Sequence, residues 1–206
     1  MDLFCWDETL PVQFYQIGAN EWQKSQAWPT LDTQPVSFFL HSMGNLNTRI
    51  PTDNSTAALE YNPNDPSPTI GGPTLHSDLE QGPYDQAPLL ESRNDVLMFD
   101  TNVLIDDVTM QGKATVHLKV SSLALDTNFT ARLCNVYPDG RSMLVCDGVF
   151  RMQIKNRYEQ ADESFLTSGE VYDCIIKFPN TAITFLASHQ ICLDITSSNY
   201  PRLNAI

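Results

Sequence analysis

The octapeptide Lys113-Ala114-Thr115-Val116-His117-Leu118-Lys119-Val120 alternates strictly between polar and apolar side chains. Successive side chains of a β-strand point to opposite faces of a sheet, so the four apolar residues share one face and the four polar residues share the other. A helix would need apolar residues at every third or fourth position instead. The octapeptide therefore predicts a strand with one buried and one solvated face.

The same strand pattern recurs through most of the chain. Residues 150–155 and 190–195 repeat the strict alternation. Shorter apolar or β-branched runs predict further strands at 12–17, 36–41, 96–99, 129–136, 142–146, 171–178 and 182–186. The only helical turn that we predict is within residues 20–28. Many short strands without intervening helices predict an all-β fold, a jelly-roll β-sandwich.

Turns and loops agree with this fold class. Tyr137-Pro138-Asp139-Gly140-Arg141 joins two predicted strands, with proline and glycine where a β-hairpin turn favours them. Residues 43–94 contain Asn62-Pro63-Asn64-Asp65-Pro66-Ser67-Pro68, which is too rich in proline for a central strand. We expect a long irregular segment there. The predicted organisation is a single sandwich domain over 1–206, with a lead-in strand and Trp-rich segment at 1–35 and the jelly roll at 36–206.

Composition and charge exclude several classes of partner. The chain has 206 residues, with 12 Lys and Arg against 25 Asp and Glu, a formal net charge of −13. That balance argues against nucleic acid and anionic membranes, because both would be repelled. No run reaches the roughly 18 apolar residues of a spanning helix, and the acidic N-terminus is unlike a signal peptide. We therefore expect a cytoplasmic location.

The five cysteines are widely spaced and lack a C-x-x-C motif. This spacing favours buried reduced thiols over a zinc site or a disulfide framework. Cys134 and Cys146 flank the predicted hairpin turn, and in some registers they could face each other diagonally.

Catalytic and metal motifs are missing from the sequence. No two glycines bracket a serine as G-x-S-x-G requires. His41 and His189 each adjoin a serine, but adjacent residues on a strand point to opposite faces. His117 lies on a polar strand face and His76 lies in a loop. The aspartates lack calcium-loop spacing. We expect no catalytic residue, no metal and no cofactor in this chain.

The positions of the tryptophans suggest a binding surface. Trp6, Trp22 and Trp28 all lie within the first 28 residues. Exposed tryptophans suit a sugar-stacking platform or a protein interface.

A series of motifs resembles a known family of hydrolases. The motifs occur in order at residues 18–22, 28–29, 61–69, 71–72, 82–86, 91–97, 121–131, 137–141, 147–151 and 195–202. The most specific is Ser121-Ser122-Leu123-Ala124-Leu125-Asp126-Thr127-Asn128-Phe129-Thr130-Ala131. Together they resemble the C-terminal domain of the Xaa-Pro dipeptidyl-peptidase, cocaine esterase and α-amino-acid ester hydrolase group.

This resemblance implies a fold and a role. It implies a jelly roll similar to galactose-binding domains, and a separate α/β-hydrolase domain that carries the Ser-His-Asp triad. The sequence departs from the family at Asn128, where the family has Asp, and at Ser188-His189-Gln190, where it has Gly-His-Arg. The family also continues beyond the position of Ile206. We therefore expect a domain truncated at both ends relative to a full-length hydrolase.

Three hypotheses of function follow. The first is an inactive accessory domain of a peptidase, esterase or amidase, with Trp22 and Trp28 at the interface with the α/β-hydrolase domain. The alternative is a stand-alone carbohydrate-binding jelly-roll module. The third is self-association as a homo-oligomer through residues 43–94.

Overall fold

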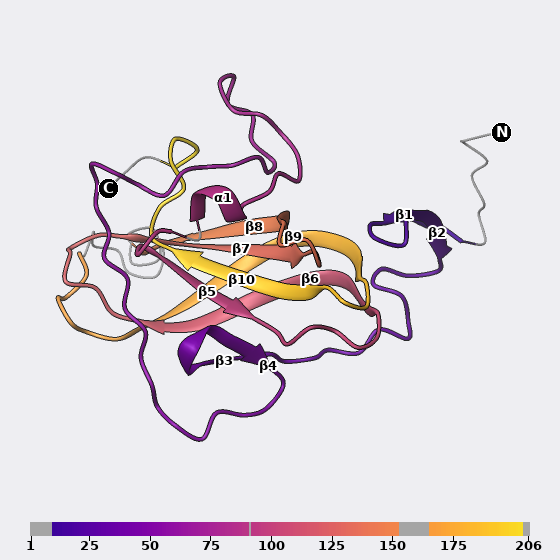
Figure 1. Ribbon diagram of the computed structural model, residues 1–206, viewed down its shortest axis with the longest axis horizontal. Coiled ribbons are helices and arrows are strands. Elements are labelled where there is room, and N and C mark those ends of the chain that lie inside the picture. Colours follow the sequence, from indigo (N-terminus) through magenta and orange to yellow (C-terminus); the bar gives the residue numbers. More distant parts are fainter. Residues whose placement is uncertain (1–9, 91, 153–164, 204–206) are drawn as a thin grey trace.

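Figure 1 shows the computed structural model, which describes residues 10–90, 92–152 and 165–203. Its larger sheet has six strands in the order β3-β4-β5-β10-β7-β8, and its smaller sheet pairs β6 with β9. A hairpin of β1 and β2 stands beyond one end of the two sheets (Figure 1). The strands are β1 (Val12–Gln16), β2 (Glu21–Ser25), β3 (Phe39–His41), β4 (Asn45–Asn47), β5 (Val96–Asp100), β6 (Val108–Val120), β7 (Asn128–Val136), β8 (Ser142–Arg151), β9 (Tyr172–Phe185) and β10 (Gln190–Thr196).

The two sheets form the predicted β-sandwich. Neighbouring strands are antiparallel except for β4 and β5, which pair in parallel. The remaining elements are a four-residue helix, α1 (Ala87–Leu90), and a 3₁₀ turn, η1 (Ser42–Gly44). The prediction of an all-β fold is confirmed.

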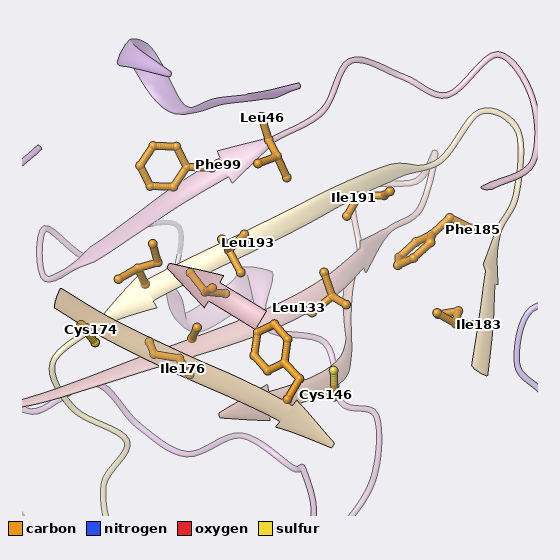
Figure 2. Close-up of a cluster of buried hydrophobic side chains, with 14 of the residues drawn as sticks. Leu46, Phe99, Leu133, Cys146, Cys174, Ile176, Ile183, Phe185, Ile191 and Leu193 are labelled. Atoms are coloured by element: carbon orange, nitrogen blue, oxygen red, sulfur yellow. The ribbon is translucent and has the colours of Figure 1, made fainter. Parts of the chain in front are cut away.

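The core lies between the inner faces of the two sheets. Alternate residues of β10 and β7 supply one side of it, and alternate residues of β6 and β9 supply the other, as the period of two in their sequences requires. Figure 2 shows these side chains meeting between the sheets. The labelled members are Leu46, Phe99, Leu133, Cys146, Cys174, Ile176, Ile183, Phe185, Ile191 and Leu193.

Gly148 allows β8 to approach β9 closely across this core. A Cβ atom at Gly148 would lie 2.8 Å from both the Lys177 carbonyl oxygen and Ile176 Cγ2, and 3.2 Å from Phe178 Cδ1. A real Cβ does not approach a backbone oxygen so closely, so only glycine fits here.

Two predicted strands form one long strand in the structure. The strands predicted at 171–178 and 182–186 merge into β9 (Tyr172–Phe185), which continues through Pro179 and Asn180. The register of β6 against β9 shifts between Lys113 and Thr115, opposite this proline. A bulge leaves a residue without a ladder hydrogen bond, so a proline is tolerated there.

Several boundaries and one element differ from prediction. The helical turn within 20–28 is wrong, because Glu21–Ser25 is the second strand of a hairpin that Gly18 and Asn20 close with positive φ angles. Within predicted strand 36–41, only Phe39–His41 is a strand. The strand predicted at 150–155 ends at Arg151, and its positions from 153 lie outside the described residues.

Cys134 and Cys146 lie on opposite faces of the larger sheet. Cys146 pairs with Leu133 and faces the core, whereas Cys134 pairs with Leu144 on the outer face. A bulge between Leu133 and Cys134 separates the two registers. The diagonal contact that one register would allow is therefore not formed.

The segment 43–94 is largely irregular, as predicted, and part of it covers the outer face of the larger sheet. It contains β4 and α1, and isolated bridges join Pro68 to Tyr200 and Asp85 to Met143. Among the described residues, no helix has both the length and the apolar character needed to cross a membrane.

Candidate functional site

The four histidines do not form a catalytic triad in the described part of the chain. His189 is buried, and its Nδ1 lies 2.9 Å from Asn135 Oδ1. His41 Nε2 lies 3.0 Å from the Arg49 carbonyl oxygen, and His76 Nδ1 accepts a hydrogen bond from the Asp78 backbone N–H. His117 Nε2 lies 3.2 Å from the hydroxyl oxygen of Thr115. Among the described residues, no histidine links a nucleophile to a carboxylate, the arrangement that acyl transfer by a triad needs.

Neither a metal cluster nor an aromatic-lined groove is found among the described residues and the two hollows that they form. Over residues 10–90, 92–152 and 165–203, no three His, Cys, Asp or Glu side chains are placed to hold a metal ion. One hollow of about 370 Å³ lies over β6 and β9 beside His117, Lys119 and Ile175. Another of about 60 Å³ lies beneath α1. Neither is lined by Phe, Tyr or Trp, the rings on which a sugar would stack.

A buried polar network is the main chemical feature of the outer face of the larger sheet. Its centre is Arg132 on β7, whose side chain is fully buried. Arg132 Nη2 donates to the Pro68 carbonyl oxygen at 2.9 Å and to Asn199 Oδ1 at 3.2 Å. One arginine thus holds two chain segments that are far apart in sequence against the same strand.

Carboxylates on neighbouring strands surround Arg132. Asp194 of β10 and Asp147 of β8 are its direct cross-strand neighbours. Asp147 also forms an ion pair with Arg202. Burial lowers the pKa of Arg132, and the charge of Asp194 is the largest opposing influence. Burial likewise raises the pKa of Asp194, partly offset by a Cys192 hydrogen bond and by Arg132. The cost of removing these groups from water outweighs their attraction.

Backbone hydrogen bonds complete the attachment of the two segments. Thr69 N–H donates to the Tyr200 carbonyl oxygen at 2.7 Å, and Tyr200 N–H donates to the Ser67 carbonyl oxygen at 2.9 Å. Ser67 N–H donates to Ser198 Oγ at 2.7 Å. Because Ser67, Thr69 and Ser198 are buried, these hydrogen bonds satisfy their polar groups as well as fix the two segments.

A second ion pair fixes the same segment farther along. Arg93 donates from Nε and Nη2 to the two oxygens of Asp95, at 2.7 and 2.9 Å. Its Nη1 lies 3.2 Å from Asp65 Oδ1. A bidentate pair of this kind is geometrically specific, so Arg93 sets the position of the proline-rich loop relative to β5.

Two thiols share the Asp194 carboxylate on this face. Cys134 and Cys192 are directly opposite each other on β7 and β10. Cys192 Sγ lies 3.2 Å from Asp194 Oδ1, and Cys134 Sγ lies 3.8 Å from Oδ2. Burial, with the Asp194 charge as the next contribution, raises the pKa of both thiols. These cysteines are therefore protonated and unreactive, in keeping with the predicted reduced thiols.

Our sequence reasoning missed this network. Arg132, Asp147 and Asp194 sit at alternate positions of strands whose other residues are apolar, which by itself predicts a solvated outer face. Only the burial of that face by residues 62–90 and 197–202 makes them interior groups. The one sequence signal for this burial was the length of the proline-rich segment, because a loop of that length in a compact domain usually has a specific role.

The two predicted interface tryptophans lie in different surroundings. Trp22 is 62% exposed on the hairpin, and its ring contacts the Tyr15 ring edge-on at 5.5 Å between centroids. Trp28 is half-buried, packs against Phe14 at 4.9 Å and donates from Nε1 to Asn180 Oδ1 at 3.0 Å. The structure therefore does not bring the two indoles together.

The sequence as a whole matches one family. The family of X-Pro dipeptidyl-peptidase C-terminal non-catalytic domains aligns with residues 5–205. The chain belongs to this family. The segments that hold the buried network, around Ser67 and from Ile195 to Arg202, fall within the motifs that carry the resemblance.

Characterised relatives are much longer than this chain. Cocaine esterase of Rhodococcus sp. (strain MB1 Bresler) is 36% identical over 200 residues, which are 93% of this chain and 34% of that protein. The chain thus spans about a third of the length of the relative it matches.

Solved structures share the fold. An α-amino acid ester hydrolase is 26% identical with a TM-score of 0.80, over 94% of this chain and 34% of its own. An aminopeptidase from the marine sediment archaeon Thaumarchaeota archaeon aligns over 96% of this chain and 34% of its own. Its TM-score is 0.81 and its identity 24%, so this second match supports the fold alone.

Proposed function

We propose that this chain is the accessory, non-catalytic C-terminal domain of a serine hydrolase. The observation that carries the proposal is its membership of a non-catalytic domain family, together with its match to only 34% of cocaine esterase. No described histidine links a nucleophile to a carboxylate as a triad requires, and this is in keeping with the same role.

In this proposal the partner is an α/β-hydrolase domain that carries the Ser-His-Asp triad. The accessory domain packs on it and helps to shape or assemble its active site, and the parent enzyme cleaves a peptide, ester or amide bond. Trp22 and Trp28 are the two candidate interface residues from the sequence, and Trp22, the more exposed of them, is the stronger candidate. A buried indole supplies a large contact area and a hydrogen-bond donor, which suits a permanent domain interface.

We further propose a cytoplasmic enzyme and a single sandwich domain with residues 1–35 as its lead-in. The free, buried thiols of Cys134, Cys146 and Cys192 support a reducing compartment. The hydrogen bonds of Gln16 to Thr184 and of Gln111 to Gln16 attach the lead-in to the smaller sheet.

The purified chain should show no turnover of Xaa-Pro dipeptide amides or aryl esters, because it supplies no activated nucleophile. Release of product would be followed spectroscopically, with full-length cocaine esterase as the positive control for esters. Turnover by the chain that a serine-directed inhibitor abolishes would contradict the accessory role.

A further inference from the structure

One side of the β1–β2 hairpin continues the core-facing side of the smaller sheet. Ile17 follows β1 and is bridged to Ile183 of β9. Its N–H donates to the Ala182 carbonyl oxygen at 3.0 Å, and its carbonyl oxygen accepts from Thr184 N–H at 2.8 Å. Bridged residues in neighbouring strands lie on the same side of a sheet. Because Ile183 is buried in the core, Ile17 lies on the core-facing side.

The same side carries the exposed aromatic pair. Tyr15 lies two residues before Ile17 in an extended strand, so the two share a side. Trp22 is the register partner of Tyr15 and joins them. We call Tyr15, Ile17 and Trp22 the hairpin surface. They are 41%, 46% and 62% exposed, although in β9 the same side of the sheet is covered.

The position of the hairpin explains this exposure. It projects beyond the end of the larger sheet (Figure 1), so no strand of that sheet lies over it. A two-stranded hairpin with an apolar side is marginally stable in water without a cover. Three adjacent large apolar side chains on such an element indicate a missing neighbour rather than scattered surface residues.

The opposite side of the hairpin is covered by this chain itself. Trp28 packs on Phe14, which alternates with Tyr15, and Trp28 also binds Asn180 of β9. The hydroxyl of Thr30 donates to Gln111 Oε1 at 2.7 Å. The segment after β2 thus folds back over this side. These contacts indicate that Trp28 holds the hairpin in place.

We propose that the hairpin surface is the docking site for the catalytic portion of the parent hydrolase, with Trp22 as its central anchor and Trp28 outside the contact. This inference rests on the proposed function. The occupant follows from length, because cocaine esterase has two thirds of its chain beyond the part matched here. Exposed Trp and Tyr on a rigid strand are the side chains that dominate protein interfaces.

The test is co-purification of this chain with the unmatched two thirds of cocaine esterase, co-expressed with an affinity tag. The C-terminal third of cocaine esterase serves as the positive control. Dissociation constants are compared for the unaltered chain, Trp22→Ser, Tyr15→Ser and Leu123→Ser. Leu123 is the matched control, because it is 87% exposed but follows the far end of β6. The part of β6 from Met110, the partner of Ile183, to Val120 spans roughly 30 Å and separates Leu123 from Ile17.

We expect the unaltered chain and Leu123→Ser to bind alike, and both Trp22→Ser and Tyr15→Ser to bind at least tenfold more weakly. Circular dichroism and thermal unfolding establish that each variant is folded. If Trp22→Ser does not fold, the comparison uses Tyr15→Ser alone. Trp28→Phe, which keeps an aromatic ring against Phe14 but loses the hydrogen bond to Asn180, should bind as the unaltered chain does.

Each other outcome rejects a specific statement. Equal binding by the unaltered chain and both hairpin variants would overturn the docking site while leaving the accessory function intact. No binding by the unaltered chain, when the positive control binds, would contradict the proposed function itself. A dimer of this chain in light scattering that Trp22→Ser dissociates would show a second copy as the occupant and would also overturn the inference.

Discussion

At the scale of single residues, Arg132 decides how the outer face of the larger sheet is closed. Among the described residues it is the largest fully buried side chain, and it lies between the carboxylates of Asp194 and Asp147. A buried ion network of this kind adds little net stability over an apolar replacement of all its members, but removing one member leaves charges unpaired. The network therefore acts mainly to fix which loops cover the sheet.

Replacing Arg132 with Met should lower the free energy of unfolding by about 3–5 kcal/mol, because buried carboxylates lose their partner. Arg141→Met is the matched control, since Arg141 pairs with Asp139 at the surface with half of its side chain exposed. That change should cost no more than about 1 kcal/mol. Urea unfolding of both variants measures the difference, and equal costs would show that the Arg132 network is not buried as described.

Asp194 should give stability a distinct pH dependence. Burial raises its pKa in the folded protein, so the folded state holds the proton more tightly than the unfolded chain does. In the unfolded chain the pKa of an aspartate is about 3.9. The resulting stabilisation is complete below that value and is lost as the pH rises through the folded pKa. Asp194→Asn does not titrate, so the stability of the unaltered chain relative to this variant should fall as the pH rises.

Urea unfolding of the two proteins from acid to neutral pH measures this trend. A relative stability that rises with pH would mean that Arg132 dominates and that the pKa of Asp194 is lowered.

At the scale of elements, the contact of β8 with β9 depends on one missing side chain. A Cβ atom at position 148 would collide with the Lys177 carbonyl oxygen and with Ile176 Cγ2, and glycine avoids this collision because it has none. The backbone oxygen belongs to a paired strand, so it cannot move without disturbing the pairing with β6.

Gly148→Ala should therefore lower the free energy of unfolding by about 1–3 kcal/mol, the usual cost of overpacking. Val149→Ala is the neighbouring control, because Val149 is on the opposite face of β8 and partly exposed, and it should cost about 1 kcal/mol or less. Thermal unfolding compares the two. If alanine at 148 is the better tolerated, the sheets are farther apart than the structure places them.

At the scale of the whole molecule, the outer face of the larger sheet and the core-facing side of the hairpin differ in whether this chain covers them. The outer face of the larger sheet is covered by this chain's own segments through Arg132 and Arg93. The core-facing side of the hairpin is not covered by the described chain. The net charge of −13 acts on this scale too, since it disfavours anionic partners but has no bearing on an apolar contact.

The fold class could be predicted from the sequence alone, since an alternation of period two is a local property that each strand displays on its own, as in residues 113–120. It also indicated the family and the missing triad, because motifs and their spacing are read along the chain. The prediction failed at residues 20–28, where a short polar strand has no periodic apolar signal and forms only by pairing with β1.

Which side of each element is buried became clear only from the folded arrangement of the chain. Arg132 and Asp194 occupy positions that alternation assigns to solvent, and a loop from more than sixty residues away covers them. Trp22 and Trp28 look equivalent in sequence, yet one is packed by Phe14 and the other is left exposed. Burial depends on contacts between distant segments, which no local pattern encodes.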